Sequence, residues 1–345
     1  MERPLAEKYQ QPSIRASSCD FVDRVPARGG PSTKLHEESR IAEVIFAGFF
    51  PVISRKGDRT ATKYDRARPI LSLPSIPSKP SPLIIGHRGA SALAPENTLC
   101  AFRKAFQDGA AGVELDVRLA GDGVPVVIHD PTLRRTGLRE GVVASMTSGE
   151  LRQMDVGSWF NRAHPELAQA EYSRQFVPTL DQVFDLCMNR GEVIYVEMKT
   201  DKAGDSHVEL AGAVAEIVNQ RGFYDRVVVV SFNLNSIAAI KTTDSAIVTG
   251  ALFEPRRNPV KTLRKHPMIT AALACGADQI LLHRLIASRR LVDLANENDL
   301  RPVVWTVDDP KWMARRAGCG IHAVITNNPA LMATAFERRG QYGER

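Results

Sequence analysis

The chain has 345 residues, 43% of them hydrophobic, which is enough for one large domain or for two domains of ordinary size. Its five cysteines are widely spaced and include no Cys-x-x-Cys pair, which argues against a disulfide framework and against a cysteine-based zinc site. The formal net charge is +6, and most of the basic excess lies in the first 82 residues.

Residues 1–82 predict a poorly ordered leader that ends in a linker. The chain begins MERPLAEKYQ, which lacks the apolar core of a secretory signal. The apolar run at residues 41–53 is too short to cross a bilayer, because a spanning helix needs about 20 residues. We therefore expect a cytoplasmic protein, and the scattered cysteines agree with a reducing compartment.

Basic side chains in this leader are densest from Arg55 to Arg68. The simplest interpretation is a solvated tail, and we expect no nucleic-acid partner. A weak peripheral contact with a membrane is the alternative, because a basic segment beside an apolar run can bind anionic lipid. The apolar run at residues 41–53 can instead pack on the main domain.

Five prolines in residues 69–82 predict a semi-extended linker, so we expect the folded domain over residues 83–340. From there, short runs rich in Val, Ile and Leu alternate with stretches typical of helices. The expected strands are residues 83–88, 112–117, 193–199, 227–232, 246–253, 277–282, 302–307 and 323–326. The expected helices are residues 97–108, 180–189, 208–221, 234–242, 288–298 and 310–317.

Many of these strands are apolar throughout, which is typical of a parallel sheet covered on both faces. Eight such strands joined by crossover helices predict an α/β fold, a closed (β/α)8 or TIM barrel. A doubly wound open sheet is the alternative fold. The first strand is not followed by Gly-x-Gly-x-x-Gly, which argues against a dinucleotide site.

A ninth apolar run, at residues 125–130, does not fit the alternation of strands and helices. Only the turn Gly121-Asp122-Gly123 separates it from the strand before it, and such a turn predicts an antiparallel hairpin. We expect the hairpin to bring His129 opposite Asp116. It also begins a small insertion, at about residues 117–178, over the mouth of the barrel.

Three acidic residues stand on two of the expected strands. Glu114 and Asp116 are two apart and so face the same side, and Glu197 and Lys199 repeat that spacing on the next barrel strand. The flanking Val, Leu and Ile residues indicate burial, and buried acids need partners. Because oxygen ligands favour hard cations, we expect Glu114, Asp116 and Glu197 to bind Mg²⁺ or Ca²⁺.

Two histidines accompany these acids. His87 ends the first expected strand and His129 ends the hairpin. A histidine titrates near neutral pH and therefore suits general acid and base catalysis, although a lone histidine at a strand end is often structural. Because each stands beside a charged residue and near the carboxylates, we expect both to be catalytic.

The cationic side chains of Arg88 and Lys199 suit an anionic substrate, since a guanidinium matches the oxygens of a phosphate. A structural ion pair with Glu114 or Glu96 is the alternative role for Arg88, and we expect Glu96 to support the site without binding metal. Trp305, near the carboxyl end of a late strand, is expected to form a wall of the substrate pocket or part of the core.

Further along the chain, Arg134 and Arg135 in the insertion are expected to be solvated. Asn97 and Thr98 are both candidates for the cap of the first expected helix, because either side chain can accept a hydrogen bond from the first turn.

Several stretches resemble glycerophosphodiester phosphodiesterases, over about Leu83 to Ala335. They are GHRGASALAPENT (86–98), GVELDVRLAGDGVPVVIHD (112–130), DPTLRRTG (130–137), GSWF (157–160), VPTLDQVF (177–184), VEMK (196–199), VVVSFN (228–233) and VVWTVDD (303–309). Each is weak alone, but their combined order is specific. The resemblance implies a TIM barrel with a small insertion that hydrolyses glycerophosphodiesters to an alcohol and sn-glycerol 3-phosphate with a divalent cation.

In the pattern of that family, the acid–base pair falls on His87 and His129, and phosphate contacts fall on Arg88 and Lys199. The metal ligands fall on Glu114, Asp116 and Glu197. The chain departs from the pattern after its last expected strand, which often ends in an acid before a proline in the family and here reads Thr326-Asn327-Asn328-Pro329, and at residues 246–253, which carry no specific motif. We expect the loss of the acid to alter head-group preference, and neither departure to touch the core constellation.

Two other functions are alternatives to this one. A related barrel phosphodiesterase could act on lysophospholipids, as a lysophospholipase D does, or on inositol lipids. A non-enzymatic barrel could bind lipid head groups, but such a protein should have lost part of the residue set, and this chain retains all of it.

Overall fold

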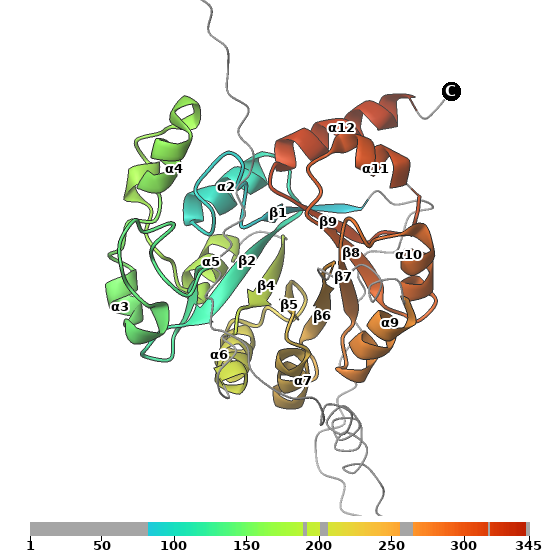
Figure 1. Ribbon diagram of the computed structural model, residues 1–345, viewed down its shortest axis with the longest axis horizontal. Coiled ribbons are helices and arrows are strands. Elements are labelled where there is room, and N and C mark those ends of the chain that lie inside the picture. Colours follow the sequence, from blue (N-terminus) through green and yellow to red (C-terminus); the bar gives the residue numbers. More distant parts are fainter. Residues whose placement is uncertain (1–81, 189–191, 201–205, 256–264, 317, 343–345) are drawn as a thin grey trace, which may run out of the picture. The chain divides into compact units, whose positions relative to one another are not determined.

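The computed structural model describes residues 82–188, 192–200, 206–255, 265–316 and 318–342 (Figure 1). The expected leader and nearly all of the expected linker, residues 1–81, lie outside the described residues. Among the described residues, no helix is both long enough and apolar enough to cross a membrane.

Eight parallel strands form a closed sheet at the centre of Figure 1, with helices around it. The strands are β1 (Leu83–His87), β2 (Gly112–Leu119), β4 (Val193–Met198), β5 (Val227–Ser231), β6 (Val248–Phe253), β7 (Gln279–His283), β8 (Arg301–Trp305) and β9 (Ala323–Thr326). Because β1 pairs in parallel with both β2 and β9, the sheet has no free edge there. The predicted (β/α)8 barrel is confirmed, and the open sheet is excluded.

Helices connect these strands on the outside of the barrel. They are α2 (Leu99–Gln107), α6 (Ser206–Arg221), α7 (Leu234–Thr243), α9 (Lys265–Ala274), α10 (Arg289–Asn296), α11 (Pro310–Arg316) and α12 (Pro329–Tyr342). The sequence did not predict α9, whose apolar residues form no single stripe, or α12. The start of α12 did carry a signal, because Asn328 accepts a hydrogen bond from the Leu331 N–H and Pro329 occupies the first turn.

The insertion begins with β3 (Pro125–Val127), which pairs antiparallel with β2 as predicted. The predicted register is wrong by one residue, because Val117 pairs with Val127 and Asp116 therefore lies opposite Ile128. The cause is the turn: Ala120 bonds to Val124 across three residues, and Gly123 has a φ of 80° that permits this tight connection.

Short helices complete the insertion, and Figure 1 shows α3 and α4 at one side of the barrel. The elements are η1 (Val143–Ser145), α3 (Ser148–Leu151), α4 (Ser158–Ala163), η2 (Pro165–Leu167) and η3 (Tyr172–Arg174). The helix α5 (Leu180–Cys187) follows the insertion and leads to β4. Apolar side chains of the hairpin and of the segment after it, among them Ile128, Leu133 and Val143, form a small separate core. The insertion thus has its own packing and can hold loops in fixed positions beside the barrel.

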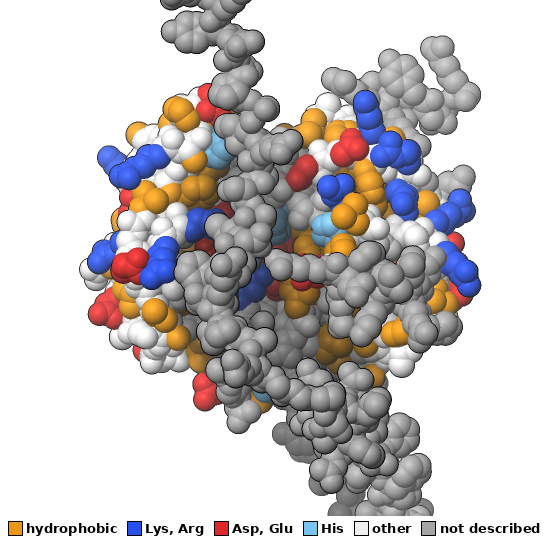
Figure 2. Space-filling view, in the orientation of Figure 1, with side chains coloured by type: hydrophobic (Ala, Val, Ile, Leu, Met, Phe, Trp, Pro, Cys, Tyr) orange, Lys and Arg blue, Asp and Glu red, His pale blue; other side chains and the backbone are white. Residues whose placement is uncertain are grey.

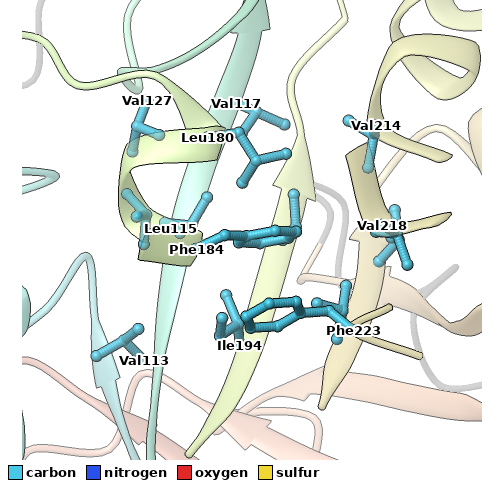
Figure 3. Close-up of a cluster of buried hydrophobic side chains, with 14 of the residues drawn as sticks. Val113, Leu115, Val117, Val127, Leu180, Phe184, Ile194, Val214, Val218 and Phe223 are labelled. Carbon is cyan, nitrogen blue, oxygen red and sulfur yellow. The ribbon is translucent and has the colours of Figure 1, made fainter. Parts of the chain in front are cut away.

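The side chains of β2 divide between two environments. Figure 3 shows Leu115 and Val117 in the apolar cluster that also contains Phe184 of α5. Because side chains alternate along a strand, Glu114 and Asp116 face the opposite way, toward the interior of the barrel. Apolar packing between β2 and its covering helix therefore fixes where the acidic residues point.

Phe184→Ala should lower the free energy of unfolding by about 3–5 kcal/mol, because it removes a fully buried ring from close packing. The ring of Phe184 is 0% exposed and stacks on that of Phe223, with centroids 4.7 Å apart. Phe176 is 46% exposed and offers a matched control, for which Phe176→Ala should cost less than about 0.5 kcal/mol. Urea denaturation measures both, and equal losses would contradict the described packing.

Candidate active site

Three acidic side chains meet at the carboxyl ends of two adjacent strands. Glu114 and Asp116 come from β2 and Glu197 comes from β4, and the parallel register places Asp116 beside Glu197. All three side chains are buried, and each offers an oxygen within 4.8 Å of those of the other two. The structure therefore brings together the three acids that the sequence singled out, at the end of the barrel where active sites of such folds gather.

Burial makes these acids unusual in their ionisation. Burial and the charge of Asp116 raise the pKa of Glu114 and that of Glu197 to about 8. Burial acts in the same direction on Asp116, but Arg88 and Lys199 lower its pKa well below the usual range. Arg88 and Lys199 thus favour the ionised form of Asp116, whereas burial favours the protonated forms of the two glutamates.

The acid cluster fits a hard divalent cation. Oε1 of Glu114 is buried without a hydrogen-bond partner, although buried polar atoms are normally satisfied. The cluster offers carboxylate oxygens alone, and such sites favour Mg²⁺ or Ca²⁺ over softer metals. A cation would also stabilise the ionised forms of the two glutamates, which have no full countercharge of their own.

Two cationic side chains contact Asp116. Arg88 Nε lies 3.0 Å from Asp116 Oδ2, and Arg88 Nη1 donates to Glu96 Oε1 at 2.8 Å. Lys199 Nζ lies 3.1 Å from Asp116 Oδ1 and also contacts Glu197. Arg88 and Lys199 both line a cavity that Glu114 and Glu197 also border, called the central cavity below. Arg88 therefore both pairs with Glu96 and lines the cavity. Glu96 is not one of the three clustered acids.

A tight turn directly after β1 sets the direction of His87 and Arg88. Arg88 has a φ of 54° and Gly89 a φ of 83°, both in the left-handed region. A Cβ on Gly89 would lie 2.5 Å from the carbonyl carbon of Ala101, so only glycine fits. The His-Arg-Gly order therefore ends a buried strand and turns the chain beside the acid cluster.

His87 is held by an amide. Its Nδ1 lies 2.6 Å from Asn327 Oδ1, while Asn327 Nδ2 donates to Asp308 Oδ2 at 2.7 Å. The amide oxygen can only accept, so the hydrogen of neutral His87 is on Nδ1, and Nε2 lies 3.9 Å from Glu114. Burial and the charge of Arg88 lower the pKa of His87. The expectation that Asn327 leaves the core constellation untouched is wrong, because Asn327 contacts His87 directly.

His129 is held by a carboxylate instead. It follows β3 by two residues, and its Nδ1 lies 2.7 Å from Asp130 Oδ1. Burial lowers the pKa of His129, whereas Asp116 and Asp130 act in the opposite direction. Although the register differs from the prediction, His129 lines the same cavity as His87. The two histidines thus have different partners, one neutral and one anionic.

Sequence reasoning missed the role of Asn97. The cap of α2 is Thr98, whose side chain accepts from the Ala101 N–H. Asn97 instead donates through Nδ2 to Asp116 Oδ2 at 2.8 Å, and its Oδ1 accepts from the Asp116 N–H at 3.2 Å. Its φ of 57° is a conformation that asparagine tolerates better than most residues. The Pro-Glu-Asn-Thr order beside the His-Arg-Gly turn was the available signal.

Arg135 was expected to be solvated; its side chain is 42% exposed, but it also makes ion pairs that the sequence did not indicate. Arg135 donates to Asp130 and to both oxygens of Glu96, at 2.7–2.8 Å. The signal was its place in DPTLRRTG, five residues after Asp130, which contacts His129.

Apolar side chains form the other side of the cavity. Trp305 lies in its wall, and the Trp305 ring packs edge-to-face on Phe232 with centroids 5.4 Å apart. The cavity has a volume of about 190 Å³. A larger cavity of about 320 Å³ shares Lys199 but contains none of the three acids or of the two histidines, so the chemistry belongs to the smaller one. On the face shown in Figure 2, acidic, basic and histidine side chains are visible around the centre.

Comparison with known proteins identifies the relatives of this chain. The model of the Glycerophosphoryl diester phosphodiesterase family matches residues 87–331. A glycerophosphodiester phosphodiesterase of Caldanaerobacter subterraneus subsp. tengcongensis is 29% identical over 265 residues, which cover 75% of this chain and 99% of that protein.

Solved structures show the same likeness. The structure of an Oleispira antarctica phosphodiesterase in complex with the product sn-glycerol-3-phosphate is 26% identical, covers 74% of this chain and 97% of its own, and gives a TM-score of 0.64. A glycerophosphodiester phosphodiesterase structure from Agrobacterium tumefaciens is 26% identical, covers 73% and 99%, and gives a TM-score of 0.59.

The barrel and its site therefore define a phosphoric diester hydrolase. The chain belongs to the glycerophosphoryl diester phosphodiesterase family. Enzymes of this family depend on a divalent cation, and the cluster of Glu114, Asp116 and Glu197 is the candidate site for it.

Binding of Mg²⁺ or Ca²⁺ at neutral pH should release protons, because Glu114 and Glu197 have a pKa of about 8 before a cation binds. The apparent affinity should accordingly rise with pH and level off above about 8. Titration calorimetry in two buffers of different ionisation enthalpy measures the release, which should be smaller in Glu114→Gln. Identical heats in the two buffers would mean that the glutamates are already ionised, against this account.

Proposed function

We propose that the protein catalyses metal-dependent hydrolysis of glycerophosphodiesters to an alcohol and sn-glycerol 3-phosphate, as a step of glycerophospholipid metabolism. The observation that carries this proposal is one cavity lined by two histidines, by Arg88 and Lys199, and by acids of a buried three-carboxylate cluster. The related Oleispira antarctica phosphodiesterase with its product sn-glycerol-3-phosphate supports the choice of substrate class.

In this proposal Glu114, Asp116 and Glu197 hold Mg²⁺ or Ca²⁺. When bound, the cation supplies positive charge beside the phosphate, which lowers the barrier for attack by a nucleophile. Arg88 and Lys199, which border the cluster, contact the nonbridging phosphate oxygens. Trp305 and Phe232 form the apolar wall against which carbon atoms of the substrate pack.

The hydrogen-bond partners of the two histidines suggest which histidine accepts a proton and which one donates it. His87 donates from Nδ1 to an amide, so its free Nε2 accepts a proton from the nucleophile, which is water or the substrate's own 2-hydroxyl. His129 is paired with Asp130, and a carboxylate stabilises the imidazolium that delivers a proton to the leaving alkoxide. We therefore propose His87 as the general base and His129 as the general acid.

All of these residues lie beyond residue 82. We propose that residues 1–82 are a separate leader, that residues 83–340 form the catalytic domain with an insertion at about 117–178, and that the protein acts in the cytoplasm. From the sequence alone, we also propose that the leader contacts anionic membranes weakly and that the protein has no nucleic-acid partner.

The direct test is hydrolysis of glycerophosphocholine by the full chain, with release of sn-glycerol 3-phosphate as the readout. Activity should vanish in excess EDTA and return with Mg²⁺ or Ca²⁺, because the carboxylate cluster needs a cation to bind phosphate. Lysophosphatidylcholine and phosphatidylinositol serve as the substrates of the two alternative enzymes. Full activity in EDTA would defeat metal dependence, and turnover of lysophosphatidylcholine alone would favour the lysophospholipase D alternative.

His87→Ala and His129→Ala should each lower turnover of glycerophosphocholine by about 10²–10⁴-fold, the usual contribution of a positioned acid or base. With a nitrophenyl leaving group, His129→Ala should recover most of its activity and His87→Ala should not, since nitrophenolate hardly needs a proton. Steady-state assays of both variants on both substrates decide the roles. Recovery of His87→Ala instead would reverse the assignment.

A further inference from the structure

We propose that Arg135 is a positioning residue that holds both His129 and Arg88 in place for hydrolysis. This inference rests on the proposed function, because His129 and Arg88 belong to the machinery assigned there. Arg135 stands in the insertion, outside the barrel, and no barrel strand carries it.

The loop that carries Arg135 is itself held firmly. Leu133 is 0% exposed in the small core of the insertion. Its N–H donates to Gly141 O at 3.0 Å and its carbonyl accepts from the Gly137 N–H at 2.7 Å, while the Val143 N–H donates to Pro131 O at 3.0 Å. With the loop closed at its base and anchored at its centre, Arg135 is presented from a fixed backbone.

The guanidinium of Arg135 contacts two carboxylates at once. Nε donates to Asp130 Oδ2 at 2.7 Å, and Nη1 and Nη2 donate to the two oxygens of Glu96 at 2.7 and 2.8 Å. The contact with Glu96 is bidentate, a geometry that a planar guanidinium provides and a lysine ammonium does not. One side chain therefore bridges the insertion and the segment that follows the His-Arg-Gly turn.

Each of the two carboxylates also contacts a residue of the proposed site. Asp130 uses its other oxygen, Oδ1, to hold Nδ1 of His129 at 2.7 Å. Glu96 Oε1 also accepts from Arg88 Nη1 at 2.8 Å. Two short chains of contacts, here called relays, thus begin at Arg135. One leads through Asp130 to His129, the proposed general acid, and the other leads through Glu96 to Arg88, a proposed phosphate-binding residue.

Neither end of these relays is fixed by the sheet alone. His129 follows β3 by two residues, and Arg88 follows β1 in a left-handed turn. The Arg135 side chain is 42% exposed, so its ion pairs contribute little to stability because solvent screens them. Its effect should therefore fall on the geometry of the site and on turnover, with little change in folding.

The neighbouring Arg134 offers a matched control. Its Nε donates to Glu140 at 2.7 Å, but its side chain is 70% exposed and that of Glu140 is 78% exposed. Arg134 has the same charge, the same loop and an ion pair of the same length, yet its pair lies on the outer surface. A general effect of loop charge would appear in both arginines, whereas positioning of the site would appear in Arg135 alone.

The test compares Arg135→Gln with Arg134→Gln in the full-length enzyme on glycerophosphocholine. Arg135→Gln should lower kcat by about 10–100-fold, the usual effect of losing a residue that orients a site, with a smaller change in KM and an unchanged melting temperature. Arg134→Gln should match the wild type. Arg135→Lys should keep part of the turnover, because an ammonium retains the charge but not the fork.

Coupling to Asp130 distinguishes positioning from an independent contribution. Asp130→Asn weakens the relay to His129, so Arg135→Gln should cost less in that background than in the wild type. If the fold-losses in kcat of Arg135→Gln and Asp130→Asn multiply fully in the double variant, the inference is overturned. Equal turnover of Arg135→Gln and Arg134→Gln in an active enzyme would also overturn it, whereas a wild-type enzyme without phosphodiesterase activity would defeat the proposed function itself. If Arg135→Gln fails to fold, wild-type turnover in Arg135→Lys overturns the inference.

Discussion

Three carboxylates buried within 4.8 Å of one another are the constraint on which the rest of this site depends. Buried like charges are costly unless they are neutralised or paired. Here Arg88 and Lys199 compensate Asp116, while burial raises the pKa of Glu114 and that of Glu197 and so favours their protonated forms. A divalent cation removes the need for those protons, and the same positive charge is what a phosphodiester substrate requires. The stability of the site and its proposed chemistry therefore both depend on positive charge placed beside the buried carboxylates.

The barrel creates this constraint through strand alternation and parallel register. Apolar residues on the outer side of β2 pack on α5, which turns Glu114 and Asp116 inward, and the pairing with β4 sets Glu197 beside them. The two histidines stand at different places: His87 is the last residue of β1, and His129 follows β3 by two residues. Asn327 contacts His87, and Asp130, which also accepts from Arg135, contacts His129, so each histidine has a polar partner outside the sheet.

The features that the sequence predicted depend on local patterns. Period-two alternation located the inward acids, continuous apolar runs located the barrel strands, and the Gly-Asp-Gly turn located the hairpin. The register of that hairpin was wrong because a turn of three residues and a turn of two differ little in sequence, and one residue decides the outcome. The helix α9 was missed because it has no apolar stripe.

The features that the sequence did not predict depend on contacts between distant residues. His87 and Asn327 are 240 residues apart, and Glu96 and Arg135 are 39 apart, so no local pattern reports either pair. The sequence left Asn97 and Thr98 as alternative caps because both residue types suit that position, whereas the tertiary contact of Asn97 with Asp116 decided its role. In each case the expected residue type was compatible with a simpler local function, and only the fold reveals the partner.

The central claim is that Glu114, Asp116 and Glu197 together hold a divalent cation. A crystal structure of the full chain grown with Mn²⁺, which replaces Mg²⁺ and scatters anomalously, tests it most directly. The account predicts one strong anomalous peak at about 2.0–2.6 Å from an oxygen of each of the three carboxylates, a range typical of oxygen ligands. A peak elsewhere in the cavity, or no peak while Lys199 still contacts Asp116 and Glu197, would contradict the account.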